Sequence, residues 1–253
     1  MIFKKIKDEW TIFLVAFVFF SRIRIKIRGE IKSAEIAKSI TYMPLIGMAS
    51  ASVAFGVYYL SNFIFPQEIS ILLLMIVSVL FTGALHEDGF ADFCDGFGGG
   101  YSKEKILIIM QDSRIGVYGV IGIIFILILK YVTLIHIPKE KLFLTLLLTY
   151  SLSRITPVWI VKLSRYAKQS DSKSGAMAFG ISGWRVLAGS ILSCIFLFFF
   201  KEMFYIFVLI TILIVYVFRQ YIEKKIQGFT GDCLGAIQQI SESTLLLASI
   251  VNL

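Results

Sequence analysis

The sequence predicts an all-α, polytopic membrane protein. Of its 253 residues, 57% are hydrophobic and only 17% are charged, and the mean hydropathy is +0.82. A soluble domain of this length cannot hide so much apolar surface. The apolar runs are continuous and rich in Phe, Ile and Leu, whereas a membrane barrel would show segments of about ten residues with alternating polarity. We therefore expect α-helical spans.

The N-terminus combines a basic start, MIFKKIKDEW, with an apolar run, TIFLVAFVFF. No small-residue cleavage site follows, so we predict no cleavable signal. Because a span needs about 20 apolar residues, we expect this run to be interfacial or re-entrant. The next stretch, SRIRIKIR, would place Arg22, Arg24, Lys26 and Arg28 on one side of an extended segment. We favour binding to anionic lipid headgroups there, with phosphate recognition as the alternative.

The rest of the chain contains apolar windows that predict about six or seven membrane segments. They lie at roughly 42–65, 68–85, 115–137, 142–161, 186–200 and 203–218, with a short apolar tail at 244–253. The two windows within 186–218 are separated only by Lys201 and Glu202, so a tight hairpin and a single distorted element both stay open. We expect one membrane domain over residues 1–253, with 1–41 as a basic cytoplasmic or interfacial segment.

Lysine and arginine are distributed unevenly between alternate connections. Residues 1–41, 86–114, 162–185 and 219–243 carry twenty of them, whereas the other connections carry only Lys139, Lys141 and Lys201. The positive-inside rule therefore places the N-terminus and the long polar connections on the cytoplasmic side of the cell (inner) membrane. The same rule accounts for the net charge of +8, so we expect no nucleic-acid partner.

An acidic cluster, GALHEDGFADFCDGFGGG at 83–100, follows the second apolar window. On a helix, Asp88, Asp92 and Asp95 share one stripe, and Glu87 lies about a quarter-turn to the side. Like charges repel, and each ionised acid near the membrane core costs about 2.5–3.5 kcal/mol. We therefore expect a divalent cation, and oxygen ligands favour Mg²⁺, Mn²⁺ or Ca²⁺ over zinc. The alternative is a solvated acidic helix end.

A bound Mg²⁺ would also predict a diphosphate substrate, because this ion commonly bridges carboxylates to phosphates. The cluster ends in glycines, which have no side chain and would let backbone amides approach phosphate oxygens. They are Gly96, Gly98, Gly99 and Gly100. Two roles stay open for His86. It would be a proton acceptor or an outer partner of the metal, or it would be a hydrogen-bonded structural histidine.

Two further polar blocks fall on the predicted cytoplasmic face. Asp232, flanked by glycines in GFTGDCLGA, would be a second metal ligand, a contact to a ribose hydroxyl, or only a helix N-cap. Arg114 in QDSRIG would grip a phosphate by bidentate hydrogen bonds, or would form a capping salt bridge with Asp112.

Two cations lie within apolar windows. Arg154, in SLSRITPVW, marks a functional group or a paired charge, because an unpaired charge in a span is costly. Lys130 is less informative, since a lysine in a span can snorkel to the surface.

These blocks together resemble the cobalamin synthase family, the adenosylcobinamide-GDP ribazoletransferases. The similarity is in FTGALHEDGFADFCDGFGGG, IMQDSRIGVYGVIGI and GFTGDCLGAIQQISE, and also in SITYMPLIG and LSRITPVWIVKLSRYAK. The resemblance implies a polytopic, Mg²⁺-dependent membrane enzyme. Such an enzyme joins adenosylcobinamide-GDP to α-ribazole, or to its 5′-phosphate, and releases GMP in the last step of nucleotide-loop assembly of coenzyme B12.

The resemblance also implies roles for individual residues. The metal set would be Glu87, Asp88, Asp92 and Asp95. The catalytic set would be His86, Asp92, Arg114 and Asp232. The substrate-binding set would be Gly96, Gly98, Gly99, Asp112, Arg154 and Lys168. Lys168 stands where the family often has arginine, so it keeps the charge and loses the bidentate fork. The base, the number of metal ions and the oligomeric state, including a homo-oligomer, stay open.

Two other function classes fit parts of the sequence. A CDP-alcohol phosphotransferase of lipid synthesis also has an Asp-rich span end, but its pattern requires an arginine where this chain has Asp92. A non-enzymatic channel or carrier would use Arg154 and Lys130 to line a path. The acids gathered in a cytoplasmic connection, outside the spans, argue against that class.

Overall fold

The computed structural model describes residues 2–27, 30–167, 180–199 and 204–251, and in these the chain is helical. The only pairing of extended backbone within these ranges is an isolated parallel bridge between Tyr166 and Phe229, so the all-α prediction is confirmed. The helices are α1 (Ile2–Phe20), α2 (Ser33–Ser39), α3 (Met43–Ser61), α4 (Gln67–Thr82), α5 (Leu85–Gly99), α6 (Lys103–Ile109), α7 (Val117–Ile135), α8 (Lys139–Ser153), α9 (Thr156–Leu163), α10 (Gly183–Cys194), α11 (Phe204–Ile226) and α12 (Gly231–Ile250), with 3₁₀ turns η1 (Ile40–Tyr42) and η3 (Ile195–Phe199).

The described helices confirm a helical polytopic membrane protein, but with fewer spans than the six or seven expected. Four are long and apolar enough to cross a membrane, namely Ser33–Ser61, Val117–Ile135, Lys139–Leu163 and Tyr205–Ile226. A fifth is possible if α4 and α5, which are bent by 87°, count as one span. The count falls because Gly183–Phe199 is a shorter apolar helix, and because the apolar tail is the end of α12.

The bend between α4 and α5 separates the apolar window from the acidic helix. Gly83 and Ala84 both adopt left-handed backbone conformations, with φ of 69° and 59°. An alanine rarely takes this conformation, whereas glycine takes it readily. The chain therefore leaves α4 at a sharp angle, and α5 carries its acids out of the line of the preceding helix.

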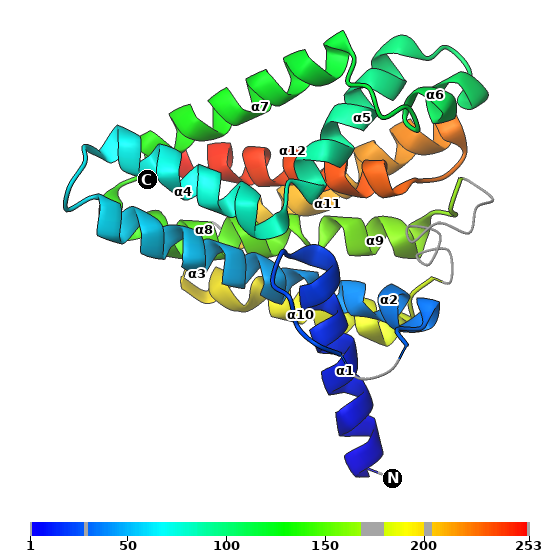
Figure 1. Cartoon of the computed structure of the whole chain (residues 1–253), viewed down its shortest axis with the longest axis horizontal. Coiled ribbons are helices and arrows are strands. Elements are labelled where there is room, and N and C mark those ends of the chain that lie inside the picture. Colours follow the sequence, from blue (N-terminus) through cyan, green and yellow to red (C-terminus); the bar gives the residue numbers. More distant parts are fainter. Residues whose placement is uncertain (1, 28–29, 168–179, 200–203, 252–253) are drawn as a thin grey trace.

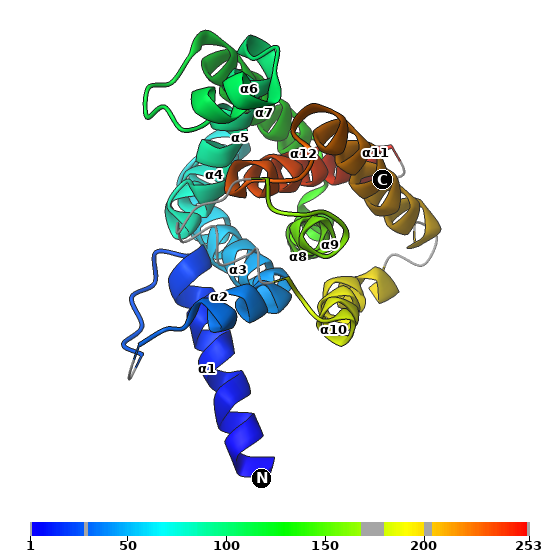
Figure 2. The same ribbon diagram turned by 90° about the vertical axis from the view of Figure 1, so that its right-hand side faces the viewer.

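Helix α12 lies at the centre of the fold, between α7 and α8 (Figures 1 and 2). It crosses α5 at two glycines: a Cβ on Gly89 would meet the Cα of Asp232 at 3.1 Å, and one on Gly235 would meet the carbonyl oxygen of His86 at 3.0 Å. Because neither glycine has a side chain, the two helices touch along their backbones. This crossing brings residues near 88 and 232 to one place.

Helix α1 projects away from the other helices at its N-terminal end (Figures 1 and 2) and is not among the helices apolar enough to cross a membrane. Glu9 anchors it, accepting a hydrogen bond from the Tyr42 hydroxyl at 2.9 Å and pairing with Arg185 of α10. After α1 the chain is non-helical through residue 27, and the side chains of Arg22, Arg24 and Lys26 are exposed. Arg28 lies outside the described residues.

Candidate active site

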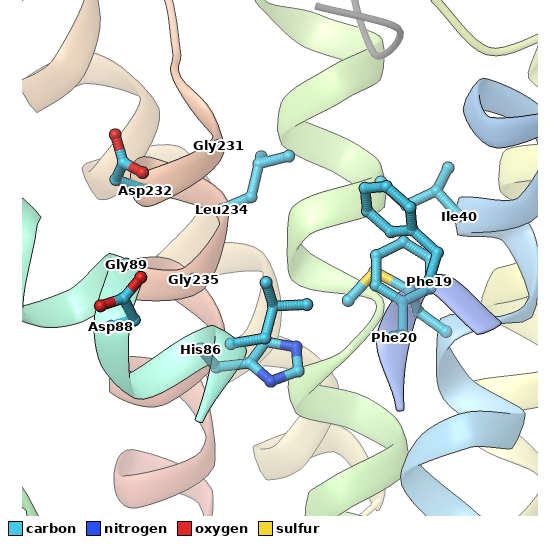
Figure 3. A pocket seen from close by; sticks show the side chains of 12 residues that line it. Phe19, Phe20, Ile40, His86, Asp88, Gly89, Gly231, Asp232, Leu234 and Gly235 are labelled. Atoms are coloured by element: carbon cyan, nitrogen blue, oxygen red, sulfur yellow. The ribbon is translucent and has the colours of Figure 1, made fainter. Parts of the chain in front are cut away.

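A pocket of about 170 Å³ lies where the end of α1 and the first turns of α5 and α12 meet (Figure 3). Its polar lining comes from His86, Asp88 and Asp232, and its apolar lining includes Phe19 and Phe20. In Figure 3 the two carboxylates lie on one side and the two phenyl rings on the other. The pocket therefore has an acidic wall and an aromatic wall.

Asp88 and Asp232 are 144 positions apart in sequence yet line the same pocket. Asp88 is exposed in the first turn of α5, and Asp232 is half-buried in the first turn of α12. The N-cap alternative for Asp232 is wrong, because Thr230 is the N-cap and its hydroxyl accepts from the amide of Cys233 at 3.3 Å. The same hydroxyl donates to Asp232 Oδ2 at 3.1 Å and so orients the carboxylate.

His86 lies at the base of this pocket and is only 3% exposed. Its buried Nε2 has no hydrogen-bond partner among the described residues. This nitrogen therefore gives no support to the alternative of a hydrogen-bonded structural histidine. A buried ring nitrogen without a partner is costly, and a ligand hydroxyl in the pocket would satisfy it.

The described residues contain no group of three or more His, Cys, Asp or Glu side chains that could hold a metal ion by themselves. Magnesium does not need such a group, since it is usually bound through one or two carboxylates together with substrate phosphates and water. Asp88 and Asp232 on one wall fit that mode of binding. The first turns of α5 and α12 also line the pocket, and the positive end of a helix dipole favours phosphate.

Comparison with known proteins gives the family of the chain. The family model described as cobalamin-5-phosphate synthase matches residues 12–250, which include every residue that lines the pocket. The chain belongs to the cobalamin-5-phosphate synthase family.

Curated relatives that bear the name adenosylcobinamide-GDP ribazoletransferase cover nearly the whole chain. The protein from Leptospira interrogans is 40% identical over 98% of this chain and 98% of its own. The protein from Vibrio cholerae is 37% identical over 96% and 94%, and the one from Clostridium novyi is 33% identical over 91% and 92%. No solved structure matches this chain.

The predicted acidic stripe lies on α5, but its acids have different surroundings. Asp92 is half-buried. Asp95 is buried, and its two carboxylate oxygens accept hydrogen bonds from the amides of Gly116 at 2.7 Å and Gly119 at 2.8 Å. Asp95 thus holds the N-terminus of α7, and a Cβ on either glycine would collide with its carboxylate. What the structure shows for Asp95 is an anchoring role.

Asp112 and Arg114 form the salt bridge that the sequence left as an alternative. Arg114 Nε and Nη2 donate to the two carboxylate oxygens of Asp112 at 3.0 and 2.7 Å. The Arg114 side chain is 88% exposed. These hydrogen bonds lower the pKa of Asp112 to about 2. Arg114 lies two residues before Gly116, whose amide is bonded to Asp95 of α5. This hydrogen bond fastens to α5 the connection in which Arg114 lies.

We expect the Asp112 carboxylate to stay ionised well below pH 4. In the folded protein the pKa of Asp112 is about 2, below its usual value of 3.8. The salt bridge therefore contributes its full stabilisation above about pH 4, and this stabilisation is lost as the pH falls through about 2. Carbon-13 titration of aspartate carboxyls in detergent, with Asp112→Asn to assign the signal, measures the midpoint. In Arg114→Ala the midpoint should rise toward 3.8; a wild-type midpoint already there would contradict the prediction.

Glu87 points into a buried polar network instead of joining the acidic stripe. Its Oε1 accepts from Gln239 Nε2 at 2.9 Å, and Gln239 Oε1 accepts from Lys130 Nζ at 2.6 Å. Lys130 also donates to Glu242 Oε1 at 2.7 Å and is only 5% exposed. Lys130 therefore does not snorkel, because α7 turns this side chain inward.

Arg154 belongs to the same network. Its Nη1 donates to the carbonyl oxygen of Tyr150 at 3.0 Å and lies 3.4 Å from Glu242 Oε2. Gln238 Nε2 donates to the same carboxylate oxygen at 2.7 Å. Of the two sequence alternatives, a paired charge is what the structure shows. The sequence analysis missed both glutamines, although the polar residues of AIQQISE inside an otherwise apolar helix were a signal.

The glycines after the acids serve helix packing. Gly96, Gly98 and Gly99 all lie within α5. A Cβ on Gly96 would collide with Met110, and one on Gly98 would come within 2.7 Å of the Tyr118 ring. Helical amides are already bonded within the helix, so the predicted phosphate-binding role has no support at these positions. Lys168 lies outside the described residues.

Proposed function

We propose that this chain joins adenosylcobinamide-GDP to α-ribazole, or to α-ribazole 5′-phosphate, and releases GMP. The product is adenosylcobalamin or its 5′-phosphate, in the last step of nucleotide-loop assembly of coenzyme B12. The observation that carries the proposal is the pocket lined by Asp88, Asp232 and His86, whose buried Nε2 has no hydrogen-bond partner among the described residues. Family membership over residues 12–250 and the names of the relatives support the choice of substrates.

In the proposed reaction, a ribose hydroxyl oxygen of the ribazole forms a bond to the phosphorus on the cobinamide side. The bond from that phosphorus to the GMP oxygen breaks, and GMP leaves with the electron pair. His86 would bind the attacking hydroxyl through Nε2, and one of the nearby carboxylates or His86 would take its proton. Arg114, exposed in the connection before α7, would offset charge on the departing GMP.

The acids are proposed to hold Mg²⁺. Asp88 and Asp232 would bind it, with Asp92 next along the α5 stripe, and the ion would supply charge neutralisation at the diphosphate. Phosphoryl transfer mainly requires positioning and charge stabilisation, and the helix N-termini at the pocket provide part of both.

We also propose the membrane placement that follows from the charge asymmetry. The protein would be a multi-pass protein of the inner membrane, with its N-terminus and the connections that carry the acids facing the cytoplasm. The exposed Arg22, Arg24 and Lys26 would contact anionic headgroups of the bilayer. Both substrates would then be met at the cytoplasmic surface.

The direct test is GMP release by the detergent-purified protein with Mg²⁺. We expect GMP from adenosylcobinamide-GDP only when α-ribazole or its phosphate is present, and loss of that activity after chelation of the metal. If no GMP appears while CMP is released from a CDP-lipid, the CDP-alcohol phosphotransferase is the correct function.

Asp92→Asn is expected to abolish measurable turnover, a loss of at least about 10²–10³-fold, with the fold intact. The amide keeps the shape of the side chain and removes the charge that an electrostatic role requires. Steady-state GMP release and the detergent melting temperature measure the two effects. Asp8→Asn, the same change at an exposed position on α1, is the matched control. Near-normal turnover of Asp92→Asn would remove Asp92 from the site.

A further inference from the structure

The aromatic wall of the pocket carries an inference about substrate choice that rests on the proposed function. Phe19 and Phe20, at the end of α1, pack edge to face with ring centroids 4.9 Å apart. Phe20 is only 5% exposed and Phe19 is half-buried. Both line the pocket opposite the acids (Figure 3). We propose that this wall is the subsite for the base of the ribazole, and that Phe19 and Phe20 select a flat, weakly polar heteroaromatic ring.

The wall is fixed in place relative to the acids. Immediately after the two phenylalanines, the amide of Arg22 donates to the carbonyl oxygen of Phe81, at the end of α4, at 2.7 Å. The Arg22 side chain fills the space where a Cβ on Gly83 would be. The end of α1 is thus tied to the bend that begins α5, three residues before His86. These contacts of Arg22 connect the aromatic wall to the helix that carries His86 and Asp88.

The size of the pocket restricts which part of a substrate it can take. At about 170 Å³ it is smaller than the roughly 300–1,000 Å³ of sites that enclose drug-sized ligands. A corrin ring is far larger than a drug fragment and cannot enter. A single flat base can, and aromatic side chains stack readily on such rings.

The polarity of the pocket distinguishes between the two bases present in the reaction. Its polar side chains are His86, Asp88 and Asp232, while Ile40 and Met43 extend the apolar lining beside the phenylalanines. A guanine ring against that lining would leave several donors and acceptors unpaired, which is costly. The benzimidazole ring of a ribazole carries no such donors. With its base on the phenylalanines, the attached ribose would lie toward His86 and the acids.

The test is steady-state kinetics with each substrate varied in turn. We expect Phe20→Leu to raise the KM for α-ribazole about tenfold, the effect of losing one stacking contact. The KM for adenosylcobinamide-GDP should stay within about twofold. Phe19→Leu, at a half-buried position, should also raise the KM for α-ribazole. It tests the subsite on its own if Phe20→Leu does not fold. Phe17→Leu is the matched control, being half-buried on α1 and outside the pocket.

The outcomes separate this inference from the proposed function. If the wild-type protein releases no GMP, the function itself fails and the ribazole assignment fails with it. If the wild type turns over but the Phe19 and Phe20 variants leave the KM for α-ribazole unchanged, only the subsite is wrong. A rise confined to the KM for adenosylcobinamide-GDP would instead assign the aromatic wall to the other substrate and overturn the proposal.

Discussion

Replacing Asp88 with asparagine is expected to lower kcat for GMP release by about 10²–10³-fold, and Asp232→Asn by a similar factor. Both carboxylates line one pocket although they come from different helices. Each substitution keeps the size of the side chain and removes one of the charges that would hold Mg²⁺ against the diphosphate. Each variant should also need a higher Mg²⁺ concentration for half-maximal activity, which a metal titration measures.

The double variant gives the sharper test of a shared site. If Asp88 and Asp232 act on one ion, removing the second carboxylate should cost much less than removing the first, because groups that act as a unit are strongly non-additive. Glu104→Gln, at an exposed position on α6, controls for charge loss elsewhere. Fully multiplicative losses would show that the two acids act independently.

The sequence alone predicts that these acids share one face of the membrane, but it does not predict that they line one pocket. Charge asymmetry and the acidic stripe of α5 are local patterns, and both are readable from the chain. The position of Asp88 and Asp232 in one pocket depends on the crossing of α5 and α12 at Gly89 and Gly235. That crossing is a long-range packing event, and no local pattern encodes it.

The rotation of each helix about its axis was the other feature that the sequence left open. Lys130 reads equally well as a snorkelling lysine, and only the packing of α7 against α12 shows that it points inward to Gln239 and Glu242. Asp95 belongs to the same regular stripe as Asp88, yet the N-terminus of α7 takes up its carboxylate. Periodicity gives the side of a helix, and the neighbours decide what each residue on that side contacts.

Glu242→Gln is expected to cause the largest loss of stability among single substitutions in the buried network. Glu242 is 4% exposed, and its two oxygens face Lys130 at 2.7 Å and Arg154 at 3.4 Å. Removing one partner of a buried ion pair costs about 3–5 kcal/mol, because the remaining charge is left uncompensated. In Glu242→Gln, both Lys130 and Arg154 lose their carboxylate partner. An unpaired charge is costly in an apolar membrane protein interior.

Thermal unfolding in detergent measures this loss. A cost of about 3–5 kcal/mol corresponds to a fall in Tm of about 6–20 °C for a chain of this size. Lys130→Met added to Glu242→Gln should raise the Tm again, because it removes one of the two unpaired cations. Glu140→Gln, at the exposed start of α8, should leave the Tm unchanged. If Glu242→Gln melts at the wild-type temperature, the network contributes no net stability. The hydrogen bonds from Glu242 through Gln239 to Glu87 would then be explained by the candidate active site, because Glu87 lies between the pocket residues His86 and Asp88.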